Sequence, residues 1–559
     1  MAPDLGLFYD QGLFTSLDYY FARTLCRAVQ EKDPLVKFTC ALTSRALSQG
    51  HICLDLNRIC SQKAPLSDYF DATVEVPSLQ TWLDTLERSE LVSGDTATPF
   101  VLDTDNRFYM GKYFDFQKRL IQNIQSRLSR DWQFADNETT DQYIRRFFTD
   151  DDPHSRAQQE AVKRALLNSL TVISGGPGTG KTYVTEIIRQ ILYQKAAENN
   201  EQKPAIISLA PTGKAASKME NGQTIHSVLK PIKNEPGFVY NKTNPLSADT
   251  VIIDEASMID ILLLTRLMEA IPERCRIIIL GDRHQLSSIQ AGSVFNDLCA
   301  AAALSSHVSV LDYNFRSGGR SGIEKLSRAI NENNIDRVED ILTRGEFPDI
   351  RFDDLSRHSL NSLIQSRATQ GFHALFRADT IETILTHLNR FKILCAHNTG
   401  NYGTLSINHL CENILRSKYN FGIDETLLRR IIMVRINDYE RQLYNGDTGI
   451  VVSARTGDRA VFKSKGRAAR EFRISDLPRH ETAFAITIHK SQGSEFDTVL
   501  ILIPDRLSPV LTRQLLYTGV TRARKKVIIA GNLEIIKSAV AVSVSRTSGL
   551  TRGLDKIVQ

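Results

Sequence analysis

The sequence has no C-x-x-C pair, and its eight cysteines are scattered over 559 residues. This spacing argues against a structural zinc site and favours reduced thiols in a cytoplasmic protein. No apolar run approaches the roughly 20 residues of a membrane helix, and we expect neither a signal peptide nor a membrane partner. Strong charge of one sign is also absent: the net charge of +5 permits a polyanionic partner without requiring one. At this length, two to four domains are expected.

One glycine-rich loop carries the clearest chemistry. The stretch TVISGGPGTGKT, residues 171–182, contains the pattern G-x-x-x-x-G-K-[ST] between an apolar strand-like run and a helix-like run. Glycines let backbone N–H groups surround phosphates, and the helix N-terminus adds positive potential. We therefore expect ATP or GTP here, with Lys181 at the β/γ-phosphates and the Thr182 hydroxyl on Mg²⁺. The loop residues expected to bind nucleotide are Gly175, Gly176, Pro177, Gly178, Thr179, Gly180, Lys181 and Thr182.

Acidic and amide residues accompany this loop. Asp254 and Glu255 directly follow the apolar run 251–253, at the carboxyl end of a predicted strand, where open parallel sheets place ligands. Such a pair can also cap a helix. After a phosphate loop, we interpret Asp254 as a direct or indirect Mg²⁺ ligand and Glu255 as the base that deprotonates the attacking water. Gln158 can read an adenine edge with its amide, although glutamine is also common on solvated helix faces.

A second set of apolar strands follows, without a second phosphate loop. We expect these strands near 391–396, 483–488, 498–503 and 527–530, and a small β-rich insertion at about 431–480. One nucleotide-binding half followed by a similar half without a loop suggests a shared ATP cleft. Such a cleft opens and closes, and the second half supplies arginine across it.

The first 130 residues carry no catalytic motif and are predicted to be mainly helical. They contain an aromatic cluster that is either core or a partner surface: Phe108, Tyr109, Tyr113, Phe114 and Phe116. Its density exceeds the 8% average of the chain, as expected where a partner buries anchors. An acidic stretch at 149–153 is predicted to be a linker, and the basic Ser/Thr-rich C-terminal tail a frayed terminus. We expect a partner-docking domain at 1–130, a first motor domain at 131–350 and a second at 351–559.

Taken together, the motifs resemble those of superfamily 1 DNA helicases, and within them the RecD family. The strings that carry this resemblance are GGPGTGKT, APTGKAA, IDEAS, GDRHQL, NFRS, TIHKSQGSEF and LLYTGVTRAR. The RecD branch is indicated by APTGKAA with Thr224–His226, and by the stretch 437–449. GHICLDL and NRFYMGKYFDFQKRL resemble the family's amino-terminal domain. The resemblance implies an α/β fold with two RecA-like parallel-sheet motor domains, a mainly helical N-terminal domain and the β-rich insertion.

The resemblance also implies residue roles. Gln285 resembles the γ-phosphate sensor, Arg316 and Arg522 resemble arginine fingers, and Gln158 matches the adenine-reading glutamine. Two sets resemble single-stranded DNA contacts: Pro211, Thr212 and Lys214 in the first half, and Thr487, His489 and Ser491 in the second. His489 can alternatively be a helix-starting polar residue. Hydroxyls and lysine hold the phosphate backbone without reading sequence.

For function, the resemblance implies an ATP- and Mg²⁺-dependent 5′→3′ DNA helicase subunit. It would act on single-stranded DNA and on double-stranded DNA ends, with RecB-like and RecC-like subunits, in the repair of double-strand breaks. No nuclease metal cluster is evident, so degradation would belong to a partner. Two alternatives stay open: a stand-alone helicase, and a regulatory subunit that uses ATP binding as a conformational switch.

Overall fold

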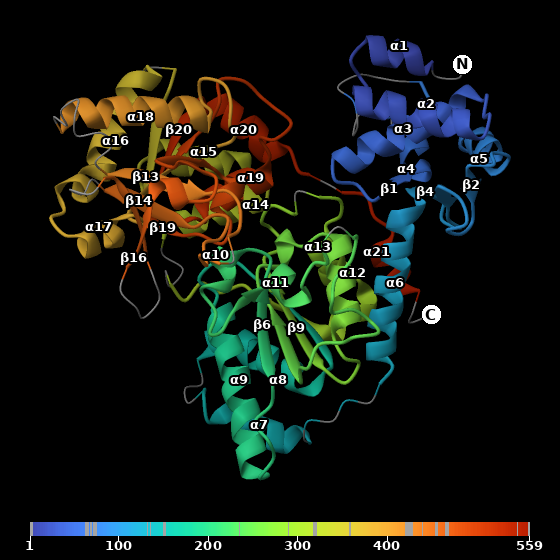
Figure 1. The fold of residues 1–559 in the computed structure, drawn as a ribbon, viewed down its shortest axis with the longest axis horizontal. Helices are drawn as coiled ribbons and strands as arrows, with labels where there is room; N and C mark the ends of the chain where they lie inside the picture. Colours follow the sequence, from blue (N-terminus) through green and yellow to red (C-terminus); the bar gives the residue numbers. More distant parts are fainter. Residues whose placement is uncertain are drawn as a thin grey trace.

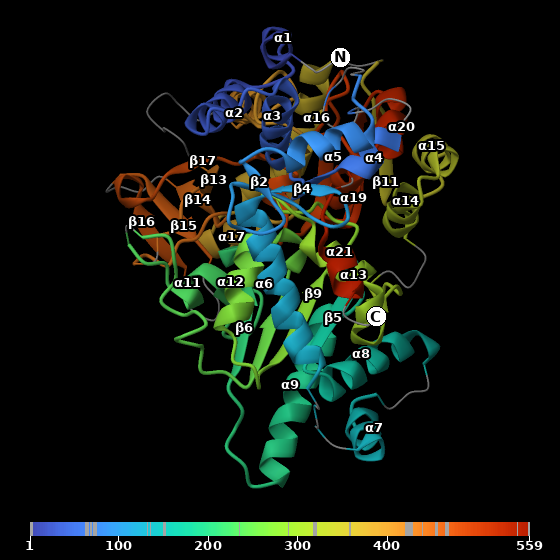
Figure 2. The ribbon, with the colours of Figure 1, turned by 90° about the vertical axis from the view of Figure 1, so that its right-hand side faces the viewer.

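The computed structural model describes residues 4–556 with short gaps, and it arranges them in three bodies (Figures 1 and 2). An N-terminal region, a first half (156–311) and a second half (321–541) lie around a common junction. The gaps are 62–65, 67–69, 71–74, 131, 133, 135, 149–151, 234, 289, 317–320, 357–358, 420–428, 439, 453–456, 464–468 and 545. Most of the predicted acidic linker at 149–153 therefore lies outside the described residues.

The first half is a six-stranded parallel sheet in the order β10-β5-β9-β8-β6-β7. Its central strands are buried on both faces, which explains their continuous apolar sequences. The strands are β5 (Leu170–Gly175), β6 (Ile206–Ala210), β7 (Gln223–Thr224), β8 (Thr250–Ile253), β9 (Arg276–Gly281) and β10 (Val308–Leu311). The helices are α8 (Arg156–Leu167), α9 (Lys181–Glu198), α10 (Gly213–Ala216), α11 (Ile225–Leu229), α12 (Ile261–Ala270) and α13 (Val294–Ala300). The short α7 (Asn137–Arg145) precedes them.

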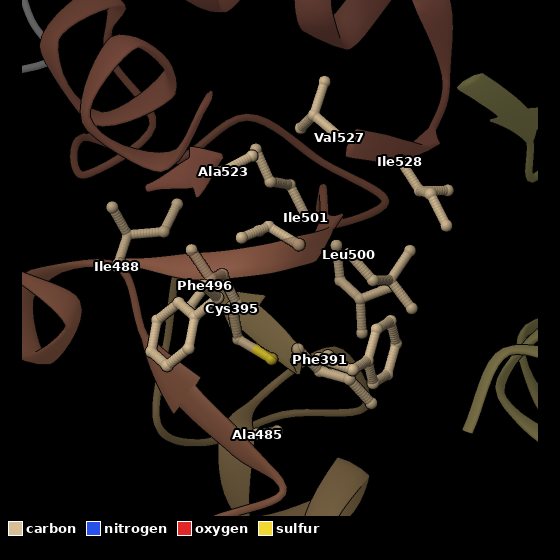
Figure 3. Close-up of a cluster of buried hydrophobic side chains, with 14 of the residues drawn as sticks. Phe391, Cys395, Ala485, Ile488, Phe496, Leu500, Ile501, Ala523, Val527 and Ile528 are labelled. Carbon is tan, nitrogen blue, oxygen red and sulfur yellow. The ribbon is translucent and has the colours of Figure 1, made fainter. Parts of the chain in front are cut away.

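The second half is a five-stranded parallel sheet in the order β11-β20-β19-β12-β18. Its core includes the packed apolar side chains drawn in Figure 3, such as Phe391, Phe496 and Ile501. The strands are β11 (Ile350–Asp354), β12 (Phe391–Cys395), β18 (Ala485–Thr487), β19 (Phe496–Leu502) and β20 (Ala523–Gly531). The helices are α14 (Gly322–Asn331), α15 (Ile335–Thr343), α16 (Leu360–Arg377), α17 (Ile381–His387), α18 (Thr404–Lys418), α19 (Arg513–Val520) and α20 (Leu533–Ala541).

The predicted β-rich insertion is an antiparallel sheet of five strands in the order β16-β15-β14-β13-β17. It has its own small apolar cluster around Ile432, Val451 and Phe462. The strands are β13 (Arg430–Val434), β14 (Thr448–Val452), β15 (Arg459–Phe462), β16 (Arg470–Arg473) and β17 (His480–Thr482). The predicted fold class, two parallel-sheet domains with a mainly helical N-terminal domain and this insertion, is confirmed.

The N-terminal region combines helices with a four-stranded sheet in the order β1-β4-β3-β2. Its helices are α1 (Leu5–Asp10), α2 (Ser16–Ala28), α3 (Pro34–Ser48), α4 (Leu56–Ser61), α5 (Leu79–Glu87) and α6 (Gly111–Leu128). Its strands are β1 (Cys53–Asp55), β2 (Val92–Ser93), β3 (Phe100–Leu102) and β4 (Arg107–Met110). The long α6 leaves this region and runs along the first half (Figures 1 and 2), against α12.

The aromatic cluster of this region is core and not a partner surface. Phe108 and Tyr109 are fully buried and Phe116 nearly so, while Tyr113 and Phe114 pack against the core of the first half. Tyr109, Phe116 and α6 residues such as Leu120 share one apolar cluster with that half. The density of aromatic residues therefore gives no support for docking, because this chain itself buries them.

The prediction of a frayed C-terminus is wrong, because a short helix, α21 (Leu550–Asp555), is packed into the molecule. The segment crosses from the second half to the first (Figure 1), where α21 packs against α6 and α13. There Leu550 and Leu554 are fully buried in the core of the first half. Thr547 exchanges hydrogen bonds with the N-terminal region, through its N–H to His51 Nδ1 and its carbonyl to the Ile52 N–H. The C-terminal segment therefore links the second half, from which it comes, to the first half and the N-terminal region.

Packing crosses both predicted domain boundaries. Phe116 and Leu120 of α6, from before residue 130, join the core of the first half. Leu326 and Val338, from before residue 350, join the core of the second half. Helices α14 and α15, which precede residue 350, therefore pack with the second half. The division into folding units at 1–130, 131–350 and 351–559 stays a prediction.

Candidate nucleotide and DNA site

The phosphate loop leaves the sheet at the carboxyl end of β5 and ends where α9 begins. Gly178 and Gly180 have φ angles of +84° and +90°, a region that glycine enters without strain. A Cβ atom on Gly180 would lie 2.1 Å from Nε2 of Gln158, so a larger residue there would displace the Gln158 amide as well as strain the backbone. The loop backbone therefore curves around the N-terminus of α9, which is an anion-binding arrangement.

Lys181 and Thr182 occupy the first turn of α9, as the loop pattern predicts. The Lys181 ammonium donates hydrogen bonds to the carbonyl oxygens of Gly175 and Gly176. Phosphate oxygens make stronger, charge-assisted bonds than carbonyls do, so a triphosphate can draw Lys181 away from the loop backbone. Lys181, Thr182 and Asp254 line one cavity of about 250 Å³.

Asp254 and Glu255 follow β8, and they adjoin this cavity. The Glu255 N–H donates to the Asp254 carboxylate at 2.8 Å, and Glu255 has a left-handed φ of +53°. Burial, followed by the neighbouring Glu255 carboxylate, raises the pKa of Asp254, while Lys181 lowers it. The Thr182 hydroxyl and the Asp254 carboxylate are oxygen donors of the kind that Mg²⁺ prefers. The residues present therefore fit a magnesium ion.

Gln158 and an aromatic side chain lie beside the loop. Gln158 is buried, and its Nε2 donates to the Thr179 carbonyl at 3.0 Å. Sequence reasoning missed Phe315, which is 41% exposed and whose N–H donates to the Gly178 carbonyl at 3.0 Å. An exposed ring fastened to the phosphate loop suits stacking on a nucleotide base. The sequence offered one signal for a role of Phe315, which is its position next to the predicted arginine finger Arg316.

Gln285 lies where the two halves meet. Its Nε2 donates to Asp282 at 3.0 Å, and its buried Oε1 has no hydrogen-bond partner. The Tyr517 hydroxyl of the second half donates to the same carboxylate oxygen, Asp282 Oδ2, and the Leu286 N–H donates to Thr518 Oγ1 at 3.0 Å. A buried amide oxygen without a partner is costly, and a ligand group in the cleft would satisfy it.

The two predicted arginine fingers have different surroundings. Arg316 is exposed at the cleft and forms an ion pair with Glu495 of the second half. Arg522 is 2% exposed, and its guanidinium donates to the carbonyls of Thr518 and Ser494 and to the Thr521 hydroxyl. Arg316 is therefore free to reach a ligand by changing one partner, whereas Arg522 is built into the second half.

A second cavity, of about 620 Å³, lies between the halves, and its lining includes phosphate-loop residues but not Lys181. The first half contributes Gly175, Gly176 and Asp282, and the second half contributes Tyr517 and Arg524. Arg316, from the connection between the halves, also lines it. Residues of the phosphate loop thus line both cavities, and a nucleotide bound to the loop would contact groups from both halves.

The two predicted DNA-contact sets adjoin each other at this junction. Thr212 caps α10 by accepting from the Ala215 N–H, and the Lys214 ammonium lies 5.7 Å from the Phe496 ring centre of the second half. Ser491 is fully buried and donates to the Ile488 carbonyl, while the Thr487 hydroxyl accepts from the Lys490 N–H. His489 and Pro211 are partly exposed. The hydroxyls of Thr487 and Ser491 therefore face their own backbone here, whereas Pro211, Thr212, Lys214 and His489 are all half-buried.

Two absences hold for the described part of the chain. None of its helices combines the length and the apolar character needed to cross a membrane. Nor does it contain a group of three or more His, Cys, Asp or Glu side chains arranged to hold a metal.

Comparison with protein families gives three matches along the chain. Residues 10–109 match the N-terminal domain of RecBCD enzyme subunit RecD, and residues 158–291 match an AAA domain. Residues 482–530 match the UvrD-like helicase C-terminal domain. The three matches follow the N-terminal region, the first half and the second half in order.

Individual relatives match over almost the whole length. RecBCD enzyme subunit RecD of Mycolicibacterium smegmatis is 30% identical over 96% of this chain and 97% of its own. RecBCD enzyme subunit RecD of Mycobacterium tuberculosis (strain H37Rv) is 31% identical over 98% of this chain and 96% of its own. Among solved structures, Bacteroides Pif1 bound to ssDNA is 18% identical, covers 68% of this chain and 92% of its own, and has a TM-score of 0.39. A score this low carries no argument about this chain.

Proposed function

The chain belongs to the RecD family, the DNA helicase subunit of the RecBCD enzyme, and on that premise we propose that it is an ATP-dependent 5′→3′ helicase subunit that processes double-strand breaks. The observation that carries this proposal is the convergence of a phosphate loop, an acidic pair and two arginines on one junction between two parallel-sheet halves. Opening and closing such a junction with ATP turnover moves one half against the other.

In the proposed hydrolysis, each residue acts on charge or on water. Lys181 neutralises the β/γ-phosphates, and Glu255 accepts the proton of the attacking water. Thr182 and Asp254 would hold Mg²⁺, which supplies positive charge to the phosphate oxygens. Gln285 senses the γ-phosphate, and Arg316 and Arg522 stabilise the charge that develops in the transition state. Gln158 binds the adenine, and Phe315 stacks on it.

Single-stranded DNA is proposed to cross both halves at the same junction. Lys214 and His489 would contact phosphates directly, and the remaining members of the two sets, Pro211, Thr212, Thr487 and Ser491, would shape the path. Since phosphate contacts carry no sequence information, binding should be tolerant of sequence. Opening of the cleft on product release would then move one contact set relative to the other.

RecB-like and RecC-like subunits are the proposed partners, because the relatives are named as subunits of the RecBCD enzyme. The N-terminal region, residues 1–130, is proposed to dock one of them. Its α2 exposes two large apolar side chains, Leu17 (71%) and Tyr20 (56%). Substituting both with aspartate should reduce co-purification with a RecC-like subunit. Leu405→Asp, at a 57%-exposed leucine of the second half, is the matched control.

The central test is Lys181→Gln. DNA-stimulated ATP hydrolysis should be abolished while the protein stays folded, because this lysine contributes charge and not packing. Lys163→Gln, in α8 outside both cavities, should keep full activity. Hydrolysis near the wild-type rate in Lys181→Gln would remove the proposal. Hydrolysis that single-stranded DNA does not stimulate would favour the regulatory subunit, and a fully active monomer of this chain alone would favour the stand-alone helicase.

A further inference from the structure

One carboxylate of the second half holds two arginines of the nucleotide cleft. Glu495 lies just before β19, and its side chain is only 13% exposed. Its two oxygens accept from Arg316 Nη2 at 3.1 and 3.2 Å, and Oε2 accepts from Arg524 Nε at 2.9 Å. Arg316 and Arg524 both line the cavity of about 620 Å³ between the halves.

The charge balance at Glu495 favours a permanent carboxylate. Burial alone would raise the pKa of Glu495, but the cations Arg316, Lys218 and Arg524 outweigh it and lower the pKa to about 2. Glu495 is therefore ionised at every pH at which an ATPase works. One carboxylate is consequently shared by two cleft arginines, so the three side chains together keep a net charge of +1.

The main chain of Arg316 is held by the first half, whereas its guanidinium is bound by the second half. The Arg316 N–H donates to Asn314 Oδ1 at 3.0 Å, and Asn314 Nδ2 donates to the Pro177 carbonyl at 3.2 Å. The adjoining Phe315 N–H donates to the Gly178 carbonyl. Arg316 is thus anchored beside the phosphate loop at its main chain, and its charged end is bound across the cleft by Glu495.

We propose that Glu495 is a positioning residue for ATP hydrolysis, which holds the Arg316 guanidinium, together with Arg524, until the terminal phosphate of ATP displaces it. The exchange replaces one anionic partner by another, so no unpaired charge is left in the cleft. It also breaks the ion pair between the halves only when nucleotide is present. This proposal rests on the proposed ATPase function.

The test is the Michaelis constant for ATP in Glu495→Gln. Without the competing carboxylate, Arg316 and Arg524 are available to the triphosphate, and KM should fall about fivefold, the scale of one partly exposed ion pair. A role in stability alone would lower the amount of active protein and leave KM unchanged. An unchanged or higher KM would overturn the proposal.

The matched control is Asp497→Asn. Asp497 lies two residues further along the chain, in β19, and pairs with Lys525 of β20 at 2.8 Å, outside both cavities. Its substitution should leave KM within error of the wild type. In an Arg316→Gln background, Glu495→Gln should lower KM much less, because the main arginine that it frees is gone. Equal effects in both backgrounds would contradict the assignment to Arg316.

A conservative variant covers the case in which Glu495→Gln does not fold. Glu495→Asp keeps the charge and withdraws it by about 1.5 Å, one carbon–carbon bond. KM should fall there too, by a smaller factor, and an unchanged KM would overturn the proposal. If the Lys181→Gln variant instead kept the turnover of the wild type, the proposed ATPase function itself would be disproved. The two failures are therefore distinguishable.

Discussion

The Tyr517 hydroxyl donates a hydrogen bond to Asp282 Oδ2 at 2.9 Å, and it thereby joins the second half to the first. Asp282 Oδ2 also accepts from Gln285 Nε2, the proposed γ-phosphate sensor. Burial, followed by the nearby Asp282 carboxylate, raises the pKa of Tyr517, so the tyrosine stays protonated and remains a donor. The orientation of Gln285 therefore depends on contact between the halves.

Tyr517→Phe should lower kcat for DNA-stimulated ATP hydrolysis by about tenfold, since a hydrogen bond to a charged group contributes about 1.5–3 kcal/mol. Single-stranded DNA affinity should change little, because Tyr517 lines the nucleotide cavity. Tyr193→Phe, in α9 and outside both cavities, serves as the control. Loss of DNA affinity with unchanged kcat would show that Tyr517 belongs to the DNA path instead.

Substituting the two arginine fingers should separate catalysis from stability. Arg316→Ala and Arg522→Ala should each lower turnover by about a thousandfold or more, with nucleotide binding weakened far less. Only Arg522→Ala should also lower Tm, by about 5 °C or more, because it removes three buried hydrogen bonds from a guanidinium. Thermal unfolding and ATPase assays on both variants check this. An equal loss of binding and turnover in Arg522→Ala would make Arg522 a plain binding residue.

Binding to single-stranded DNA should depend on salt and on pH through Lys214. Each neutralised phosphate contributes about −0.7 to the log–log salt slope, and Lys214→Ala should remove roughly one such contact. Burial and, to a lesser degree, Lys218 lower the pKa of Lys214 to about 8. DNA affinity should therefore fall as pH rises from 7 to 9, and Lys214→Ala should flatten this fall. Fluorescence anisotropy titrations measure both slopes, and unchanged slopes would move the DNA path elsewhere.

Asp297 of α13 should make the packing of the C-terminal segment, residues 546–556, more stable in mild acid. Burial raises the pKa of Asp297 to about 7, against hydrogen bonds from Ser548 and Thr551 that lower it. The folded state therefore binds this proton more tightly than the unfolded state, whose aspartate has a pKa of about 3.9. Its contribution to stability is present at low pH, declines as pH rises from about 4 to 7, and is level above that.

Comparison with Asp297→Asn isolates this effect. The Tm of the wild type relative to the variant should be higher at pH 5.5 than at pH 8, because asparagine does not titrate. Equal Tm differences at both pH values would show that Asp297 is ionised throughout this range. Limited proteolysis at the C-terminal segment should follow the same trend.

The sequence by itself determined the elements that depend on local chemistry. The phosphate loop lies between β5 and α9, and Asp254 follows β8, because apolar runs and glycine spacing act over a few neighbouring residues. The buried central strands of both sheets and the β-rich insertion were predictable for the same reason, whereas the strands β7, β10 and β11 at the sheet edges were not predicted. The family resemblance added the roles of Gln285 and the arginines, which no local pattern contains.

Tertiary structure alone decided which distant residues meet. Arg316 and Glu495 are 179 positions apart, and Ser548 and Asp297 are 251 apart, so no periodicity could pair them. The aromatic residues that suggested a docking surface pack inside this chain, Phe108 in the N-terminal core and the other four in or against the core shared with the first half. Burial is a property of the packed chain: it depends on which surfaces remove each other from water, and a sequence pattern gives only the apolar surface available for that packing.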